Sequence, residues 1–182
     1  MRNFFCCGEA GSGKSSVVNY FNKLHGYKMG RFAYPLYDIC RNYLNMTEKD
    51  RILLQRVGTD VARWNIDDDI WVNRLLEDME IVTLYHKNFL NSDVGFVVED
   101  VRFPKEAKIL LKRGFLGFYL DVPSETRSNR LMSRDGGIPE GFEKHESETA
   151  ILGFRDTLMW INGVGTIEEV SNLIEKFVIN ED

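Results

Sequence analysis

The stretch CCGEAGSGKSS, Cys6–Ser16, lies almost at the start of the chain and decides the fold. It fits the pattern G-x-x-x-x-G-K-[ST], in which Gly8, Gly13, Lys14 and Ser15 hold the defining positions. The glycines of this pattern permit a tight turn whose backbone N–H groups point at phosphate oxygens. The lysine reaches the β- and γ-phosphates, and the hydroxyl binds Mg²⁺. The stretch therefore predicts a nucleotide-phosphate site.

The residues on either side of the loop have the patterns that a phosphate loop needs. Phe4–Cys7 is a short apolar run suited to a buried parallel strand, and apolar residues recur at helical spacing over Lys14–Leu24. The alternative is a flexible Gly/Ser-rich turn between two core elements, and the two flanks favour the phosphate site over it. The apolar helical positions are Val17, Val18, Phe21 and Leu24, and the further loop residues expected at the nucleotide are Gly11, Ser12 and Ser16.

Length, composition and charge limit what the chain can be. With 182 residues, 43% hydrophobic and 28% charged, it suits one globular domain with a substantial core. A net charge of −5 gives no general attraction to nucleic acids or anionic membranes. No apolar run reaches the length of a membrane span or a signal peptide. We therefore expect a cytoplasmic protein with neither nucleic acid nor membrane as a partner.

Two groups of residues invite interpretation as metal or redox sites. The three cysteines, Cys6, Cys7 and Cys40, lack zinc-site spacing, and their odd number argues against a disulfide framework. We interpret the first two as small buried hydrophobic residues. The acidic run Asp67–Asp69 is either a metal cluster or a helix start whose carboxylates complement the helix dipole, and we favour the helix start.

Strand and helix patterns alternate along the rest of the chain. This alternation implies a parallel sheet wrapped by helices. Further strands are predicted near Tyr27–Phe32 and over Val94–Asp100, Phe115–Val122 and Thr157–Asn162. Helices are predicted from Pro35, over Glu48–Trp64, after Asp67, and over Pro104–Arg113, Ser124–Arg134 and Thr166–Val178. In the second of these helices, one face is expected to carry Ile52, Leu53, Val57 and Val61.

Polar residues after the third predicted strand indicate a second ligand site. Asp100 and Arg102 follow that strand at its carboxyl end, where ligands bind in open α/β sheets. Asp100 can hold Mg²⁺ through water or accept a substrate hydroxyl, and Arg102 can grip a phosphate bidentately. The alternative is a structural salt bridge. No base-reading motif of switch GTPases is present, so two facing anion sites favour a small-molecule kinase.

A basic helix supplies a candidate lid over about residues 124–147. Arg127, Arg130 and Arg134 share one helical face and repel one another unless an anion lies among them. A solvated basic face is the alternative. Beside a phosphate loop, these arginines are typical of a lid that neutralises the transferring phosphoryl group. Three glycines behind them, Gly136, Gly137 and Gly141, would give the backbone freedom to move.

Six segments, in order, resemble the bacteriophage deoxynucleoside monophosphate kinases, within the P-loop nucleoside monophosphate kinase group. They are GEAGSGKS, FAYPLYD, LLQRVGTDVARWNIDDDIWVNRL, VVEDVRFPKEA, HESETA and INGVGTIEEV. The first segment is common to many nucleotidases. The combination of LQ-x-x-GTD with DVRFP-x-EA is more specific. Dephospho-coenzyme A kinases are similar in the first, fourth and last segments.

The resemblance implies a helical insertion over about residues 33–90, within which Pro35–Trp71 binds the monophosphate. Gln55, Thr59 and Arg63 stand at four-residue steps on one helix face, and Arg63 is the preferred phosphate ligand among them. An exposed helix arginine is its alternative role. Related kinases often carry lysine where this chain has Tyr37, so a phosphate contact there is missing or replaced by a hydroxyl or stacking contact. The resemblance also implies that Asn162 binds ATP.

Together these observations predict a single domain over residues 1–182 with a three-layer α/β/α P-loop kinase fold. The expected reaction moves the γ-phosphoryl group of ATP, with Mg²⁺, to a deoxynucleoside 5′-monophosphate. Alternatives are dephospho-coenzyme A or nucleoside kinases, and a non-catalytic nucleotide-binding module. A homodimer is an open expectation, as is a host cytoplasm for a phage protein. Lys14 and the lid arginines are the expected catalytic residues, and Ser15 and Asp100 the expected metal ligands.

Overall fold

A five-stranded sheet forms the centre of the computed structural model, which describes residues 1–135 and 146–179. The sheet order is β2-β3-β1-β4-β5, and every neighbouring pair is parallel. Parallel neighbours need crossover connections, which the intervening helices supply. The predicted parallel sheet is confirmed. Its strands are β1 (Phe4–Cys7), β2 (Lys28–Gly30), β3 (Phe96–Val98), β4 (Leu116–Asp121) and β5 (Met159–Asn162).

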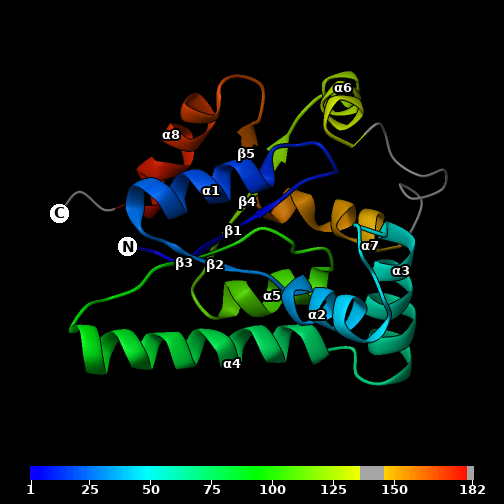
Figure 1. Cartoon of the computed structure of the whole chain (residues 1–182). Helices are drawn as coiled ribbons and strands as arrows, with labels where there is room; N and C mark the ends of the chain where they lie inside the picture. The colour runs from blue at the N-terminus through cyan, green and yellow to red at the C-terminus, as the bar shows by residue number, and fades with distance from the viewer. Residues whose placement is uncertain (136–145, 180–182) are drawn as a thin grey trace.

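Helices cover both faces of the sheet (Figure 1). On one face lie α1 (Lys14–His25) and α8 (Ile167–Val178). On the other lie α2 (Ala33–Tyr43), α4 (Ile70–Tyr85) and α5 (Pro104–Lys112). The remaining helices are α3 (Arg51–Gln55), α6 (Ser124–Asp135), α7 (Glu146–Thr149), the π-helical η1 (Arg56–Arg63) and η2 (His86–Leu90), and the 3₁₀-helical η4 (Ala150–Thr157). Within the described ranges, no helix combines the length and apolarity needed to cross a bilayer.

Strand β1 joins the two halves of the core because its side chains alternate between the faces. Phe4 and Cys6 pack with α1 and α8, whereas Phe5 and Cys7 pack with the helices of the opposite face. All four side chains are fully buried, as the apolar run predicts for a central parallel strand. Cys6, Cys7 and Cys40 are free and buried, and burial raises the pKa of Cys6 to about 12, so the thiol stays protonated and unreactive.

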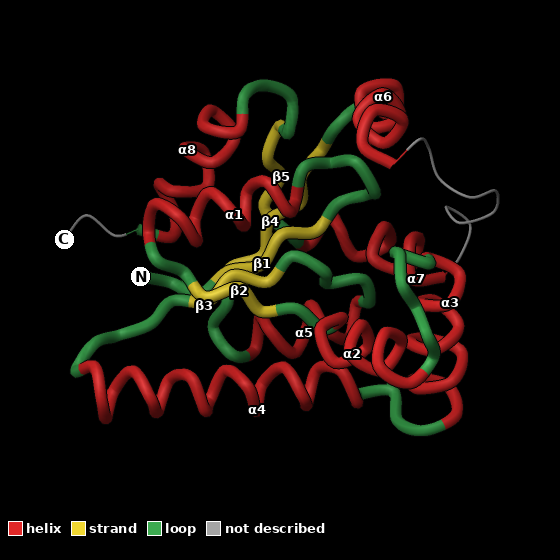
Figure 2. Tube along the Cα trace, viewed as in Figure 1, coloured by secondary structure: helices red, strands yellow, loops and turns green. Residues whose placement is uncertain are grey.

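The helices between β2 and β3 fall within the predicted insertion at about residues 33–90 and lie below the sheet in Figure 2. One expectation about them is wrong: Ile52 and Val61 are exposed instead of sharing a buried face with Leu53 and Val57. The chain leaves α-helical geometry at Arg56, and a π-helix turns less per residue, so α-helical spacing no longer aligns Val61 with Leu53. Leu24, at the end of α1, is also exposed.

The close packing of the sheet gives a first prediction. A Cβ atom at Gly117, in β4, would lie 2.6 Å from Phe5 Cζ and 2.7 Å from Leu158 Cδ2. Gly117→Ala is therefore expected to lower the free energy of unfolding by about 1–3 kcal/mol through overpacking. Urea denaturation measures the change.

The matched control is Gly153→Ala, because no atom lies within 4 Å of a Cβ placed there. We expect that control to be neutral or stabilising by up to about 1 kcal/mol. Equal stabilities for the two variants would contradict the packing described for β4.

Candidate functional site

The phosphate-loop motif forms the turn between β1 and α1, as the sequence predicts. Gly8, Gly11 and Gly13 have φ values of 144°, 82° and 94°, which disfavour residues with a side chain. A Cβ atom at Gly8 would also lie 2.7 Å from Ser12 Oγ and 2.9 Å from the Leu120 carbonyl oxygen. Helix α1 begins at Lys14 without a side-chain cap. Its N-terminus is therefore suited to bind an anion.

Lys14 lies across this loop. Its Nζ donates to the carbonyl oxygens of Gly8 at 2.6 Å and Glu9 at 3.0 Å. Burial, and after it the positive charge of Arg102, lowers the pKa of Lys14 to about 8. The ammonium group is thus held over the loop, within electrostatic range of Arg102, the residue predicted to bind the second substrate.

Helix α6 is docked on the same loop. Arg127 Nη2 lies 2.9 Å from Glu9 Oε1, and its Nε donates to the Val122 carbonyl at 3.1 Å. Arg130 donates from Nη1 to the Gly11 carbonyl at 3.4 Å and from Nη2 to the Gly163 carbonyl at 3.3 Å. These acceptors offset the repulsion between the two guanidinium groups.

The lid itself stays a prediction. Arg134, the third arginine of the predicted face, is exposed at the end of α6. Gly136, Gly137 and Gly141 lie outside the described residues.

Asp100 has a partner that the sequence did not indicate. Its Oδ1 accepts from the Phe32 N–H at 3.0 Å and its Oδ2 from the Ala33 N–H at 2.8 Å, so the carboxylate caps the start of α2. Burial raises the pKa of Asp100 to about 6, against the opposing effect of these two hydrogen bonds. Its predicted roles at Mg²⁺ or a substrate hydroxyl stay predictions.

Positive charge gathers around Tyr37 on α2. The Arg41 guanidinium carbon lies 5.5 Å from the centre of the Tyr37 ring. Burial raises the pKa of Tyr37, whereas the charges of Arg102, Arg51, Arg41 and Arg31 lower it. Arg102 is exposed after the carboxyl end of β3. Arg102 thus lies within electrostatic range of both Lys14 and Arg51.

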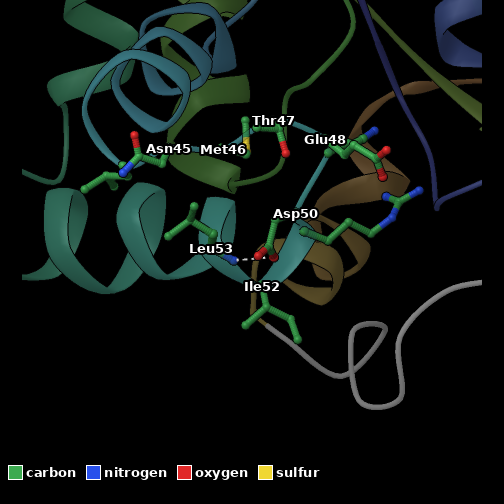
Figure 3. A pocket seen from close by; sticks show the side chains of 10 residues that line it. Asn45, Met46, Thr47, Glu48, Asp50, Ile52 and Leu53 are labelled. Atoms are coloured by element: carbon green, nitrogen blue, oxygen red, sulfur yellow. Dashed lines mark hydrogen bonds between the residues drawn. The ribbon is translucent and has the colours of Figure 1, made fainter.

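An open hollow of about 690 Å³ runs along the turn from α2 to α3 and is lined by residues 44–53 (Figure 3). At its edge Asp50 caps α3, accepting from the Leu53 N–H at 2.9 Å. The hollow includes Arg51 but no phosphate-loop residue, so we do not place the nucleotide phosphates there.

Arg63 is not placed as predicted. Its side chain is buried and forms an ion pair with the buried Glu106. Its Nη1 donates to the Asp68 carbonyl at 3.1 Å, and its guanidinium carbon lies 4.3 Å from the centre of the Phe103 ring. Both sequence interpretations, a phosphate ligand and an exposed helix arginine, require an accessible side chain. Arg63 instead ties η1 to α5.

The other predicted ligands have mixed surroundings. Thr59 is buried, and the Gln55 Nε2 is a buried donor without a hydrogen-bond partner among the described residues. Asn162 is exposed at the carboxyl end of β5, where its Oδ1 accepts from the Val164 N–H at 3.0 Å. Ser15 and Ser16 are exposed on the first turn of α1, and Ser12 is buried in the loop. Binding roles for these residues stay predictions.

The acidic run at the start of α4 is paired with a lysine. Lys105 Nζ lies 2.9 Å from Asp68 Oδ2 and 2.8 Å from Asp69 Oδ1. Over residues 1–135 and 146–179, no three or more His, Cys, Asp or Glu side chains are grouped as a metal site would require. Helix α4 begins at Ile70, directly after the run, which agrees with its interpretation as a helix start.

Sequence reasoning missed three charged residues of the candidate site: Glu9, Arg51 and Glu99. Glu9 lies inside the motif at a position that the pattern leaves undefined. Arg51 precedes the segment LLQRVGTD, and only the fold brings it near Tyr37. Glu99 directly precedes Asp100, and strand alternation alone predicts that two such neighbours point to opposite faces.

Comparison with solved structures identifies the fold. A gluconokinase from Sinorhizobium meliloti 1021 matches with a TM-score of 0.56 and 16% identity, over 94% of this chain and 87% of that chain. A shikimate kinase from Aquifex aeolicus vf5 matches with a TM-score of 0.57 and 13% identity, over 94% of this chain and 93% of that chain. No family model and no curated protein matches the sequence. The chain has the three-layer α/β/α P-loop kinase fold.

The buried ion pair gives a stability prediction. Arg63→Ala leaves Glu106 charged and uncompensated in the core, so the free energy of unfolding should fall by about 3–5 kcal/mol. Chemical denaturation measures the loss. The double variant Arg63→Met/Glu106→Gln is expected to recover a large part of it.

The control is Arg56→Ala, an exposed arginine of the same π-helix, for which we expect a change within about 0.5 kcal/mol. If Arg63→Ala were as stable as this control, the pair would have no structural role.

The pKa of Lys14 gives a pH prediction. Because it is lowered to about 8, part of the lysine population is neutral at pH 8, and bound phosphates favour the charged form. ADP binding at pH 8 should therefore take up protons, and affinity should fall as the pH rises through 8. Calorimetry in two buffers of different ionisation enthalpy measures this uptake. Lys14→Met should abolish the buffer dependence, and a buffer-independent binding enthalpy in the wild-type protein would contradict the assignment.

Proposed function

We propose that this protein is an ATP- and Mg²⁺-dependent kinase whose acceptor is a deoxynucleoside 5′-monophosphate. The observation that carries the proposal is a second positively charged site beside the phosphate loop. Arg102 lies within electrostatic range of both Lys14 and the group around Tyr37. The loop supplies the site for the ATP phosphates, and the residues around Tyr37 supply the site for an anionic acceptor.

The acceptor site has features suited to a nucleotide. Two arginines lie over aromatic rings of α2: Arg41 lies over Tyr37, and the Arg31 guanidinium carbon lies 5.2 Å from the centre of the Tyr34 ring. Arg102 and Arg51 add charge for a phosphate. Tyr37 offers both a ring and a hydroxyl where related kinases often have lysine. These surroundings support a ligand that joins a phosphate to an aromatic base.

The proposed chemistry requires positioning and charge neutralisation. A monophosphate oxygen is already a competent nucleophile at neutral pH, so no strong general base is needed. Lys14 and the arginines of α6 neutralise charge on the transferring phosphoryl group. The glycine cradle and the exposed Ser15 fit a Mg·nucleotide, for which Ser15 and a carboxylate at the end of β3 would hold the ion. Bound Mg²⁺ would supply neutralisation of the phosphate oxygens.

ADP formation from ATP, measured with a panel of acceptors, tests the proposal. We expect turnover with at least one of the four deoxynucleoside monophosphates. The panel also contains dephospho-coenzyme A, nucleosides, gluconate and shikimate. Turnover with one of those compounds instead would support kinase activity but contradict the proposed acceptor. ATP binding without turnover on any acceptor would indicate a nucleotide-binding module.

Removing the charge of Arg102 tests the acceptor site. Arg102→Ala should raise the KM for the monophosphate about tenfold or more and change the KM for ATP much less, because a charged contact to phosphate is lost. Steady-state kinetics with each substrate varied in turn measures both values. The control is Arg113→Ala. Arg113 is exposed and lies before the amino end of β4, away from the carboxyl ends of the strands. Equal changes in the two KM values would show that Arg102 does not belong to the acceptor site.

A further inference from the structure

Two consecutive carboxylates follow β3, and they point to opposite faces of the sheet. Side chains alternate along a strand: Val97 packs with α1 and α8, and Val98 packs with the helices of the other face. Continuing this alternation, Glu99 follows Val97 and Asp100 follows Val98. The contacts agree, because Asp100 accepts from the backbone at the start of α2.

The residue after β2 agrees with this direction of Glu99. Met29 is the register partner of Val97, and continuing the alternation past Gly30, the last residue of β2, brings Arg31 opposite Glu99. Arg31 Nε and Glu99 Oε1 form an ion pair. Glu99 therefore points to the face that α1 covers, and α1 carries Lys14 and Ser15 on its first turn.

Glu99 has a buried carboxylate, one oxygen of which lacks a hydrogen-bond partner among the described residues. The residue is only 8% exposed. Its Oε1 is paired with Arg31, but its Oε2 is inaccessible to solvent and has no hydrogen-bond partner among the described residues. A buried carboxylate oxygen without a partner is costly, so such an atom indicates a ligand absent from the structure. The charge of Glu99 also acts on Lys14, whose pKa it raises.

We propose that Glu99, and not Asp100, supplies the carboxylate for the divalent cation of the bound nucleotide, on the same face of the sheet as Ser15. This assignment rests on the proposed function. Carboxylate oxygens are the protein ligands that Mg²⁺ takes beside nucleotide phosphates. Asp100 has the neighbouring position in sequence, but its two oxygens hold the first turn of α2 on the opposite face.

A purely structural role for Glu99, holding Arg31, is the rival explanation, and the two make different demands on Arg31. If Glu99 serves the cation, removing Arg31 leaves the carboxylate in place, and its charge is no longer compensated by a guanidinium group. If Glu99 serves only Arg31, removing either partner has the same consequence. Arg31→Met therefore separates the explanations.

The experiment titrates the protein and ADP with Mn²⁺, the probe ion, and follows free Mn²⁺ by electron paramagnetic resonance. Glu99→Gln should weaken Mn²⁺ binding to the protein–ADP complex about 10- to 100-fold. ADP binding in EDTA should be retained, which shows that the loop is intact. Asp100→Asn and Arg31→Met should keep the Mn²⁺ affinity within about threefold. Glu99→Asp retains the charge and serves if the glutamine variant does not fold; its shorter side chain should weaken Mn²⁺ binding less.

The outcomes separate this inference from the proposed function. A wild-type protein that binds no Mn²⁺ with ADP would overturn the proposed function and the cation site together. If the wild-type protein binds Mn²⁺ with ADP and the Glu99→Gln variant has the same Mn²⁺ affinity, only the assignment of Glu99 is overturned. The same holds for Glu99→Asp when that variant is used. Loss of Mn²⁺ affinity in Arg31→Met equal to that in the Glu99 variant would also overturn it, in favour of the structural role. A loss of Mn²⁺ affinity in Asp100→Asn alone would assign the cation to Asp100.

Discussion

Strand β1 is paired along both of its edges and buried on both of its faces, and the arrangement of the whole molecule depends on this position. Its backbone pairs with β3 and β4, and its four side chains are fully buried in alternating directions. Only an apolar sequence tolerates this position, because a buried polar side chain there would have no partner. Since the strands are parallel, the segments after β1, β3, β4 and β5 all leave at the same edge. The phosphate loop, Glu99 to Arg102, the start of α6 and Asn162 are thereby gathered at one place.

Two positively charged groups near that end of the sheet, Arg63 and Lys14, differ in how their charge is compensated. Arg63 is neutralised in the core by Glu106, whose other oxygen accepts from the Arg102 N–H at 2.8 Å and the Phe103 N–H at 3.0 Å. The helical insertion is thus tied to the backbone that carries Arg102. Lys14, by contrast, hydrogen-bonds only to carbonyl and hydroxyl oxygens among the described residues, and burial lowers its pKa to about 8. An incoming phosphate would supply the missing negative charge.

The fold and the acceptor are separate questions. The two structural neighbours are named for gluconate and shikimate, yet they share this fold at 16% and 13% identity, so the fold alone selects no acceptor. We propose that selection depends on side chains of the insertion, among them Tyr37, Arg41 and Arg51. In this chain they place rings and charges together, whereas a sugar acid needs no aromatic stacking partner.

The sequence by itself determined the loop, the parallel sheet and most helices, because each depends on local patterns: glycine spacing, apolar runs and caps such as Thr166 with Glu169. Which charged residues meet was decided by the tertiary structure. Arg63 looked available because helical spacing ignores partners distant in sequence, and the π-helical turn of η1 also changed which residues face inward. Glu99 and Asp100 are indistinguishable as neighbours in a chain. The pleat of β3, the start of α2 and the position of Arg31 give them different surroundings, since a side chain's role depends on what the fold brings against it.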